Sequence, residues 1–208
     1  MSQSATTVST TRTAPEADAF YRRIYGRLYA LGYHRRRDYS HAKALCQRLL
    51  SAHRDRFETA LDVGCSTGWA VRRLAGEGVG ASGIDVAPQP VSQGRAAGLD
   101  LHRGSAAALP FEADSFDLVM STDCFEHLRP EDVEAAVDEA CRVARTTLAF
   151  KINPRVDRNG WWKLLAGTRL HLTTRSLSWW IEAFERRGCR LLDLDDSDES
   201  FVLAAPGT

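Results

Sequence analysis

The sequence predicts an α/β fold: a doubly wound, seven-stranded and mostly parallel sheet with an antiparallel closing strand. Three observations support this fold class. Short apolar runs alternate with segments of helical spacing, as in parallel strands joined by crossover helices. A glycine-containing turn directly follows the first strand and leads into a helix. Near the end of the chain an acidic turn, residues 195–199, separates two apolar runs, which indicates an antiparallel hairpin.

The length of 208 residues fits one domain with a substantial core. Residues 1–15 are rich in Ser and Thr and nearly free of apolar side chains, so we expect a disordered tail. Residues 16–55 should form helices that cover the site, and residues 56–208 the core of the domain. Within this core, residues 153–172 lack clear periodicity and are expected to be an insertion.

Two helices are predicted before the sheet, over about 16–31 and 39–53. The apolar positions of the first are Phe20, Ile24, Leu28 and Leu31. Strands are then expected over 59–63, 81–84, 99–102, 116–121, 147–152, 189–194 and 200–205. Helices are expected near 67–76, 89–97, 131–144 and 174–187. Sheets of this alternating kind bind ligands at the carboxyl ends of their strands.

Composition excludes several classes of protein. A formal net charge of +0, with 44% hydrophobic and 26% charged residues, is typical of a soluble globular protein and argues against a nucleic-acid partner. No apolar run is long enough for a membrane helix, and the N-terminal segment lacks the apolar core of a secretion signal. The five cysteines are scattered, without a C-x-x-C pair, which indicates reduced thiols in a cytoplasmic protein.

The most informative segment joins the first strand to the following helix. Gly64 and Gly68 allow the backbone to approach a ligand without an intervening Cβ atom. The helix N-terminus offers unpaired N–H groups. Asp85 ends the next strand, and its carboxylate can accept hydrogen bonds from both hydroxyl groups of a ribose. The segment therefore predicts a site for an adenosine-type cofactor.

The glycine spacing distinguishes between cofactors. A dinucleotide fingerprint needs a third glycine, but Val71 occupies that position. The D-x-G-x-x-x-G pattern beginning at Asp62 instead resembles the first motif of the class I S-adenosylmethionine-dependent methyltransferases. Residues 107–111, 115–120 and 126–128 resemble later motifs of that family, in its order and at its spacing.

This resemblance implies the class I methyltransferase fold, S-adenosylmethionine as cofactor and S-adenosylhomocysteine as product. Carried over by position, the expected cofactor-binding residues are Asp62, Gly64, Cys65, Ser66, Gly68, Asp85, Val86, Ser105, Ala106, Leu109 and Ser121. Ser105 stands where the family often has a carboxylate that binds the adenine amino group. A hydroxyl can accept the same bond, though more weakly than a charged group.

The segment after the fourth strand is expected to face the transferred methyl group. The candidate catalytic residues are Asp123, Glu126, His127 and His171. Three interpretations stay open. His127 can act as a base or contact the acceptor; these four residues can hold a divalent metal ion, as a similar set does in some family members; or Glu126 and His127 can be a structural pair. Our prediction for the site is that it contains no metal.

We expect a small-molecule acceptor, with antibiotic or other specialised-metabolite biosynthesis as the setting, and a monomer or homodimer that does not bind membranes. One alternative is an enzyme that methylates RNA or protein and binds it through basic residues of the N-terminal region. These residues are Arg22, Arg23, Arg27, Arg35, Arg36 and Arg37. The other is a protein that binds S-adenosylmethionine without methyl transfer.

Overall fold

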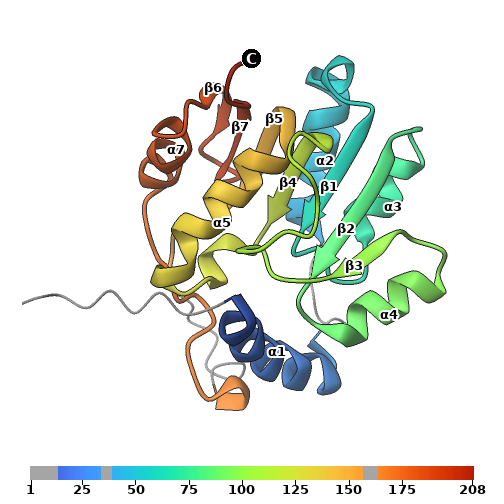
Figure 1. Ribbon diagram of the computed structural model, residues 1–208, viewed down its shortest axis with the longest axis vertical. Helices are drawn as coiled ribbons and strands as arrows, with labels where there is room; N and C mark the ends of the chain where they lie inside the picture. The colour runs from blue at the N-terminus through green and yellow to red at the C-terminus, as the bar shows by residue number, and fades with distance from the viewer. Residues whose placement is uncertain (1–13, 34–38, 157–163) are drawn as a thin grey trace, which may run out of the picture.

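A computed structural model of the chain describes residues 14–33, 39–156 and 164–208 (Figure 1). Its centre is a seven-stranded sheet with the strand order β3-β2-β1-β4-β5-β7-β6. The strands are β1 (Thr59–Val63), β2 (Gly80–Asp85), β3 (Leu101–Arg103), β4 (Phe116–Thr122), β5 (Ala144–Lys151), β6 (Arg190–Asp195) and β7 (Ser200–Ala204). The first five strands pair in parallel, and β7 runs antiparallel to β5 and β6. The predicted fold class is confirmed.

Helices cover both faces of the sheet. They are α1 (Ala14–Ala30), α2 (Ser40–Ala52), α3 (Trp69–Ala75), α4 (Pro88–Ala96), α5 (Pro130–Val143) and α7 (Leu177–Glu185), with short 3₁₀ turns η2 (Arg54–Arg56) and η3 (Phe125–His127). Successive residues of a strand point to opposite faces, so each central strand serves two cores. Leu118 and Met120 of β4 pack with α2 and α3, whereas Val119 between them packs with α5 and α7.

Some element boundaries differ from the sequence-based expectation. Helix α7 begins at Leu177 rather than near 174, because the Ser176 side chain caps it by accepting a hydrogen bond from the Trp179 N–H. Strand β5 begins at Ala144, directly after α5, three residues before the predicted start. Leu31, predicted to continue the apolar face of the first helix, lies beyond the end of α1 and is 52% exposed. The predicted disordered tail lies almost wholly outside the described residues.

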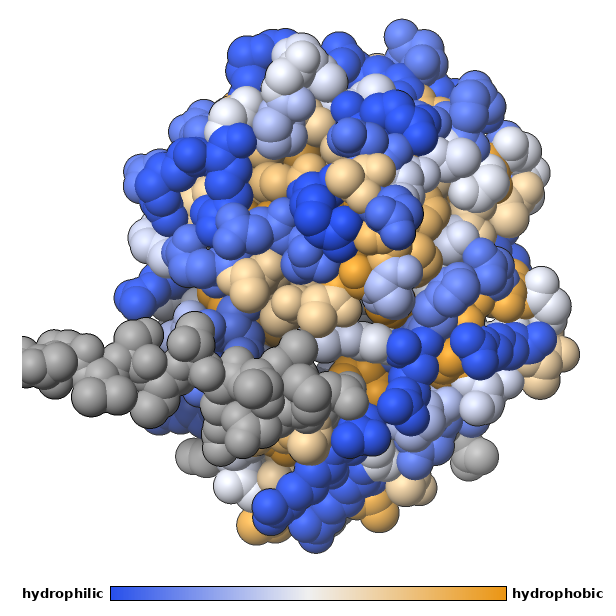
Figure 2. Space-filling view, in the orientation of Figure 1, coloured by the Kyte–Doolittle hydropathy of each residue, from blue (hydrophilic) through white to orange (hydrophobic). Residues whose placement is uncertain are grey.

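Helix α1 lies at the edge of the sheet toward which the arrows of β2 and β4 point (Figure 1). The strand order reverses between β1 and β4, so the segments that follow these two strands lead to opposite faces of the sheet and leave a crevice between them for a ligand. The face shown in Figure 2 is largely hydrophilic, with smaller hydrophobic areas between the polar side chains. Among the described helices, none combines the length and the apolar character needed to cross a membrane. The fold thus places α1 over the predicted ligand-binding edge.

Candidate functional site

The glycine loop after β1 has the strained backbone that its sequence predicts. Gly64 and Gly68 have positive φ angles of 82° and 81°, and Gly68 is the N-cap of α3. A Cβ atom added at Gly64 would lie 2.5 Å from Cys124 Sγ, closer than atoms can pack. The glycine is therefore required both for its backbone conformation and for the close approach of the segment after β4.

Asp85 at the end of β2 is tied to this loop. Its Oδ2 accepts a hydrogen bond from the Ser66 N–H at 2.8 Å, and its Oδ1 accepts one from the Ala87 N–H at 2.9 Å. Asp85 therefore fixes the shape of the glycine loop.

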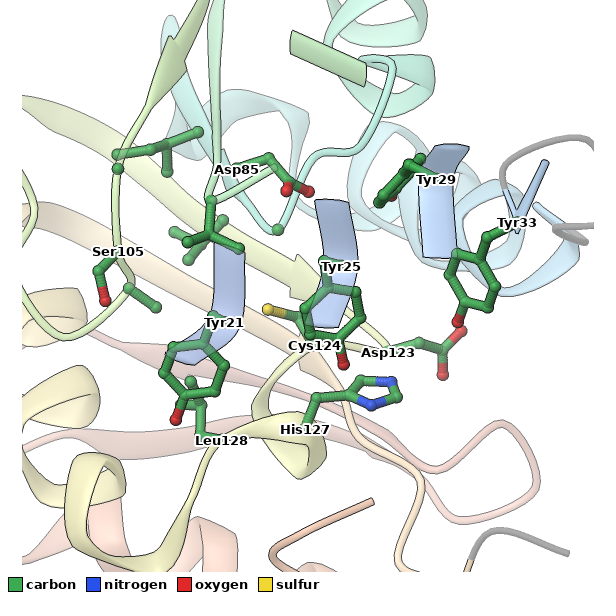
Figure 3. A pocket seen from close by; sticks show the side chains of 16 residues that line it. Tyr21, Tyr25, Tyr29, Tyr33, Asp85, Ser105, Asp123, Cys124, His127 and Leu128 are labelled. Carbon is green, nitrogen blue, oxygen red and sulfur yellow. The ribbon is translucent and has the colours of Figure 1, made fainter. Parts of the chain in front are cut away.

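Two adjoining cavities open at this edge of the sheet. The larger encloses about 630 Å³, and several predicted site residues line it (Figure 3): Gly64, Asp85, Val86, Ser105, Ala106, Asp123 and His127. The smaller encloses about 330 Å³ and is lined in part by Asp62, Cys65 and Ser66. Both cavities share Gly64 and Asp123. The structure thus gathers most of the predicted cofactor residues around one continuous hollow.

Three predicted cofactor residues do not line either cavity. Leu109 is buried in the core, and its N–H donates to Glu139 Oε2. Ser121 is buried beside β1, where its hydroxyl donates to the Val63 carbonyl at 2.8 Å. Gly68 begins α3 and acts through the backbone geometry of the loop. These three residues therefore lie beside the cavities and not in their lining.

The sequence analysis missed a row of four tyrosines on α1 and just beyond it. Tyr21, Tyr25, Tyr29 and Tyr33 line the larger cavity opposite the strand ends (Figure 3). Residues spaced by four lie on one face of a helix, so the repeat itself carried the signal. The apolar residues Ile24 and Leu28 pack on the neighbouring face. The helix therefore presents an aromatic face to the cavity beside its buried apolar stripe.

Two of these tyrosines attach α1 to the rest of the domain. The Tyr29 hydroxyl donates to Ser66 Oγ at 2.7 Å, which connects α1 to the glycine loop. The Tyr21 hydroxyl donates to Asp132 Oδ2 at 2.6 Å and accepts from the Arg129 N–H at 2.8 Å. Both tyrosines are buried. These bonds hold the aromatic wall in place over the cavity.

Tyr21→Phe is expected to lower the free energy of unfolding by about 1–3 kcal/mol, because it leaves the buried Arg129 N–H without its acceptor. Urea denaturation measures this change. Tyr39→Phe is the matched control: the hydroxyl of Tyr39 makes a longer, 3.2 Å contact with Thr67 in a half-buried setting. The control should cost about 0.5 kcal/mol or less. Equal losses in both variants would contradict the anchoring role of Tyr21.

Asp123 lies where both cavities meet and has a positive φ of 50°. Lys151 Nζ lies 2.5 Å from its Oδ1, and His41 Nδ1 lies 2.9 Å from its Oδ2. Burial alone raises the pKa of Asp123, but the hydrogen bond from His41 and the charge of Lys151 outweigh it and hold that pKa well below its usual range. Asp123 is thus an ionised carboxylate supported by two cationic partners.

Of the four candidate catalytic residues, Asp123 and His127 line the larger cavity, whereas Glu126 and His171 lie behind its wall. His127 Nδ1 donates to the Leu170 carbonyl at 3.0 Å. Glu126 is fully buried, and its Oε1 accepts from the Asn153 N–H at 3.1 Å. Burial, followed by the negative charge of Asp123, raises the pKa of Glu126 to about 8.

Comparison with known proteins indicates which cofactor this cavity binds. Residues 60–147 match the sequence profile of a family described as a methyltransferase domain. The central part of this chain is thus similar to a methyltransferase domain. The profile covers β1 to the first half of β5, which includes the glycine loop, Asp85 and the segment after β4. The cofactor of this domain family is S-adenosylmethionine, as the sequence resemblance implied.

Individual relatives of the methyltransferase domain are more distant. Ajmaline N-methyltransferase of Rauvolfia serpentina is 34% identical over 108 residues, and the match covers 48% of this chain and 36% of the relative. The chain thus aligns with only about a third of the length of that relative.

Solved structures share the fold at lower sequence identity. A chain from the complex of the Haloferax volcanii Trm112 methyltransferase activator with a methyltransferase has a TM-score of 0.64 and 22% identity, covering 92% of this chain and 98% of that one. A protein solved in connection with the conversion of a disulfide bond into a thioacetal group during echinomycin biosynthesis has a TM-score of 0.59 and 20% identity, covering 77% and 80%. Both likenesses extend over most of this chain and confirm its fold.

Proposed function

We propose that the protein transfers the methyl group of S-adenosylmethionine to a small-molecule acceptor bound beneath α1. The observation that carries this proposal is the 630 Å³ cavity at the carboxyl ends of the strands, which joins the glycine loop and Asp85 to a wall of tyrosines. Its lining of aromatic and apolar side chains with a few polar groups is typical of sites for small molecules, and the cofactor would take up part of it. The aromatic wall would leave room for a compact acceptor.

The residues present fit the cofactor. Gly64 lines both cavities, and Asp85 offers acceptors for the ribose hydroxyl groups. Val86, Ser105 and Ala106 line the side of the larger cavity next to Asp85, where we place the adenine ring. The smaller cavity, bordered by Asp62, would take the amino-acid end. These assignments leave the space near Asp123 and His127 for the acceptor.

When bound, S-adenosylmethionine supplies an electrophilic methyl group on a sulfonium: the acceptor–carbon bond forms as the carbon–sulfur bond breaks, and S-adenosylhomocysteine leaves. The residues of this chain would orient the acceptor, exclude water and receive its proton. With Nδ1–H donated to the Leu170 carbonyl, a neutral His127 has its basic lone pair on Nε2. His127 is therefore the proposed base or acceptor contact.

Several findings favour a specialised metabolite as the acceptor. The curated relative acts, by its name, on ajmaline, and one structural neighbour belongs to echinomycin biosynthesis. The Arg35–Arg37 cluster, on which the RNA alternative partly rested, lies outside the described residues and does not bear on this choice. The five cysteines are all free thiols, which supports a reducing, cytoplasmic setting.

Methyl-labelled S-adenosylmethionine tests the proposal. The protein should transfer label to members of a panel of small amines, phenols and alcohols, and should release an equal amount of S-adenosylhomocysteine. Transfer to bulk RNA or to protein extract, with no transfer to the small molecules, would contradict the choice of acceptor class. Salt dependence supplies a second criterion, because an RNA-methylating enzyme would lose affinity steeply as salt rises.

A further inference from the structure

We propose that Cys141 and Cys189 are an oxidisable pair of thiols, which a peroxide converts into a disulfide bond between α5 and the residue before β6. Their Sγ atoms lie 3.6 Å apart, although 48 positions separate the two residues in the sequence. A disulfide bond needs a separation of about 2.05 Å. Each sulfur therefore has to move by about 0.8 Å, which rotation of the two side chains can supply.

The backbone holds both thiols on regular elements. Cys141 lies in the last turn of α5, and Cys189 lies between the end of α7 and the first residue of β6. The Cys189 N–H donates to the Phe184 carbonyl at 3.3 Å, which fixes the chain reversal after α7. Gly188 permits this reversal with a φ of 86°. The short distance between the sulfurs is therefore a property of the packed fold.

Arg187 makes a second connection between the same parts of the fold. Its Nε lies 2.5 Å from Asp138 Oδ1, and a terminal nitrogen lies 2.7 Å from Glu134 Oε2. Both acidic residues belong to α5, about one and two turns before Cys141. The hydrogen bond with Cys141 and the charge of Arg187 lower the pKa of Cys189, although burial opposes them. The pair thus favours a thiolate, the reactive form of cysteine, with a second sulfur in contact.

The other cysteines have different surroundings. Cys46 and Cys65 are buried, and burial raises the pKa of both thiols, to about 12 for Cys46. Both thiols therefore stay protonated and shielded from an oxidant. Cys124 is half-buried and lines the larger cavity, so an oxidant can reach it as well as Cys141, which is also half-buried. An experiment on the pair has to distinguish it from Cys124.

The reaction balances with hydrogen peroxide as the oxidant. The thiolate sulfur of Cys189 attacks one peroxide oxygen and the O–O bond breaks, which gives a sulfenic acid and hydroxide, and a proton converts the hydroxide to water. The Cys141 sulfur then attacks the sulfenic sulfur, the S–O bond breaks, and the oxygen leaves as a second water with the Cys141 proton. The two thiols lose two electrons and two protons, and one peroxide becomes two waters.

The disulfide bond would tie the edge of the sheet to the body of the domain. Strand β6 is the last in the strand order and pairs with β7. A cross-link over 48 positions restricts the unfolded chain and so stabilises the fold. Neither cysteine lines the two cavities, so the binding of cofactor should not change. The inference is thus a stabilising response to oxidation, and it does not depend on the proposed methyl transfer.

The test is treatment of the reduced, purified protein with a small excess of hydrogen peroxide, followed by catalase, by thiol counting in denaturant and by peptide mass mapping. We expect two of the five thiols to disappear. The chain should become lighter by two hydrogens, and one linked pair of peptides should contain Cys141 and Cys189. The melting temperature should rise by roughly 5–15 °C and return to its starting value after dithiothreitol.

Cys141→Ser, at a half-buried position, should remove the rise in melting temperature that peroxide causes, and Cys189→Ala should do so through the other sulfur. The matched control is Cys46→Ala, which removes a thiol from α2 and should keep both the disulfide bond and the rise. Retention of all five thiols after peroxide would overturn the proposal. So would linked peptides that contain Cys124 or come from two chains, an unchanged melting temperature in the oxidised protein, or a wild-type rise in Cys141→Ser.

Discussion

Asp85→Ala is expected to lower the affinity for S-adenosylhomocysteine by about 10- to 150-fold, which corresponds to about 1.5–3 kcal/mol for lost charge-assisted hydrogen bonds. Two effects combine. The ribose hydroxyl groups lose their carboxylate acceptor, and the Ser66 N–H loses the bond that shapes the glycine loop. Isothermal titration calorimetry measures the change directly and does not require a known acceptor.

Asp100→Ala is the control for this prediction. Asp100 precedes β3, one strand away from Asp85, and its carboxylate binds the hydroxyl of Ser82 at the surface. The variant removes an aspartate at the amino end of the neighbouring strand and touches neither cavity, so the affinity should stay at the wild-type value. If Asp85→Ala bound S-adenosylhomocysteine as tightly as Asp100→Ala, the ribose-binding role of Asp85 would be wrong.

Gly64→Ala is expected to abolish measurable cofactor binding and to destabilise the fold. The new Cβ would lie 2.5 Å from Cys124 Sγ and 2.7 Å from Cys124 Cβ, so the loop or the segment after β4 must move. Overpacking of this kind costs about 1–3 kcal/mol. The positive φ adds a cost of roughly 1–2 kcal/mol for any residue with a side chain. Urea denaturation and calorimetry measure the two effects.

Gly78→Ala isolates the contribution of close packing. Gly78 has a similar φ of 78°, but a Cβ atom there would meet nothing within 4 Å. The two variants therefore share the backbone strain and differ in the overlap with Cys124. Gly64→Ala should be less stable than Gly78→Ala by about 1–3 kcal/mol, and only Gly78→Ala should keep cofactor binding. Equal stabilities, with binding retained in both, would contradict the close approach at Gly64.

Local signals explain why so much of the fold was predictable. Strand β1 has the predicted bounds, because an apolar run ends there at a glycine turn. The class I order of the sheet followed from alternating elements and a terminal hairpin. The observed boundaries differ from the predicted ones in two places. Helix α7 begins later than predicted because Ser176 caps it, and β5 begins earlier because it follows α5 without a loop.

The site was predictable only where its residues are close together in the sequence. The glycine loop and Asp85 were found from their spacing in the sequence. His41 and Lys151 contact Asp123 from α2 and β5, and no local sequence pattern predicts these contacts. The tyrosine row was missed because the apolar residues of α1 dominated its periodicity. Ser121 follows the family pattern, yet its hydroxyl faces the Val63 carbonyl, a direction that sequence does not encode.

The most direct test of the central claim is calorimetric titration of S-adenosylmethionine and S-adenosylhomocysteine into the purified wild-type protein, with NAD⁺ as the comparison ligand. The account predicts one site per chain with a micromolar dissociation constant for both sulfur compounds. It predicts no binding of NAD⁺, because the loop lacks the third glycine of a dinucleotide fingerprint. Absence of binding by both sulfur compounds, or tighter binding of NAD⁺, would contradict the assignment of the cavity.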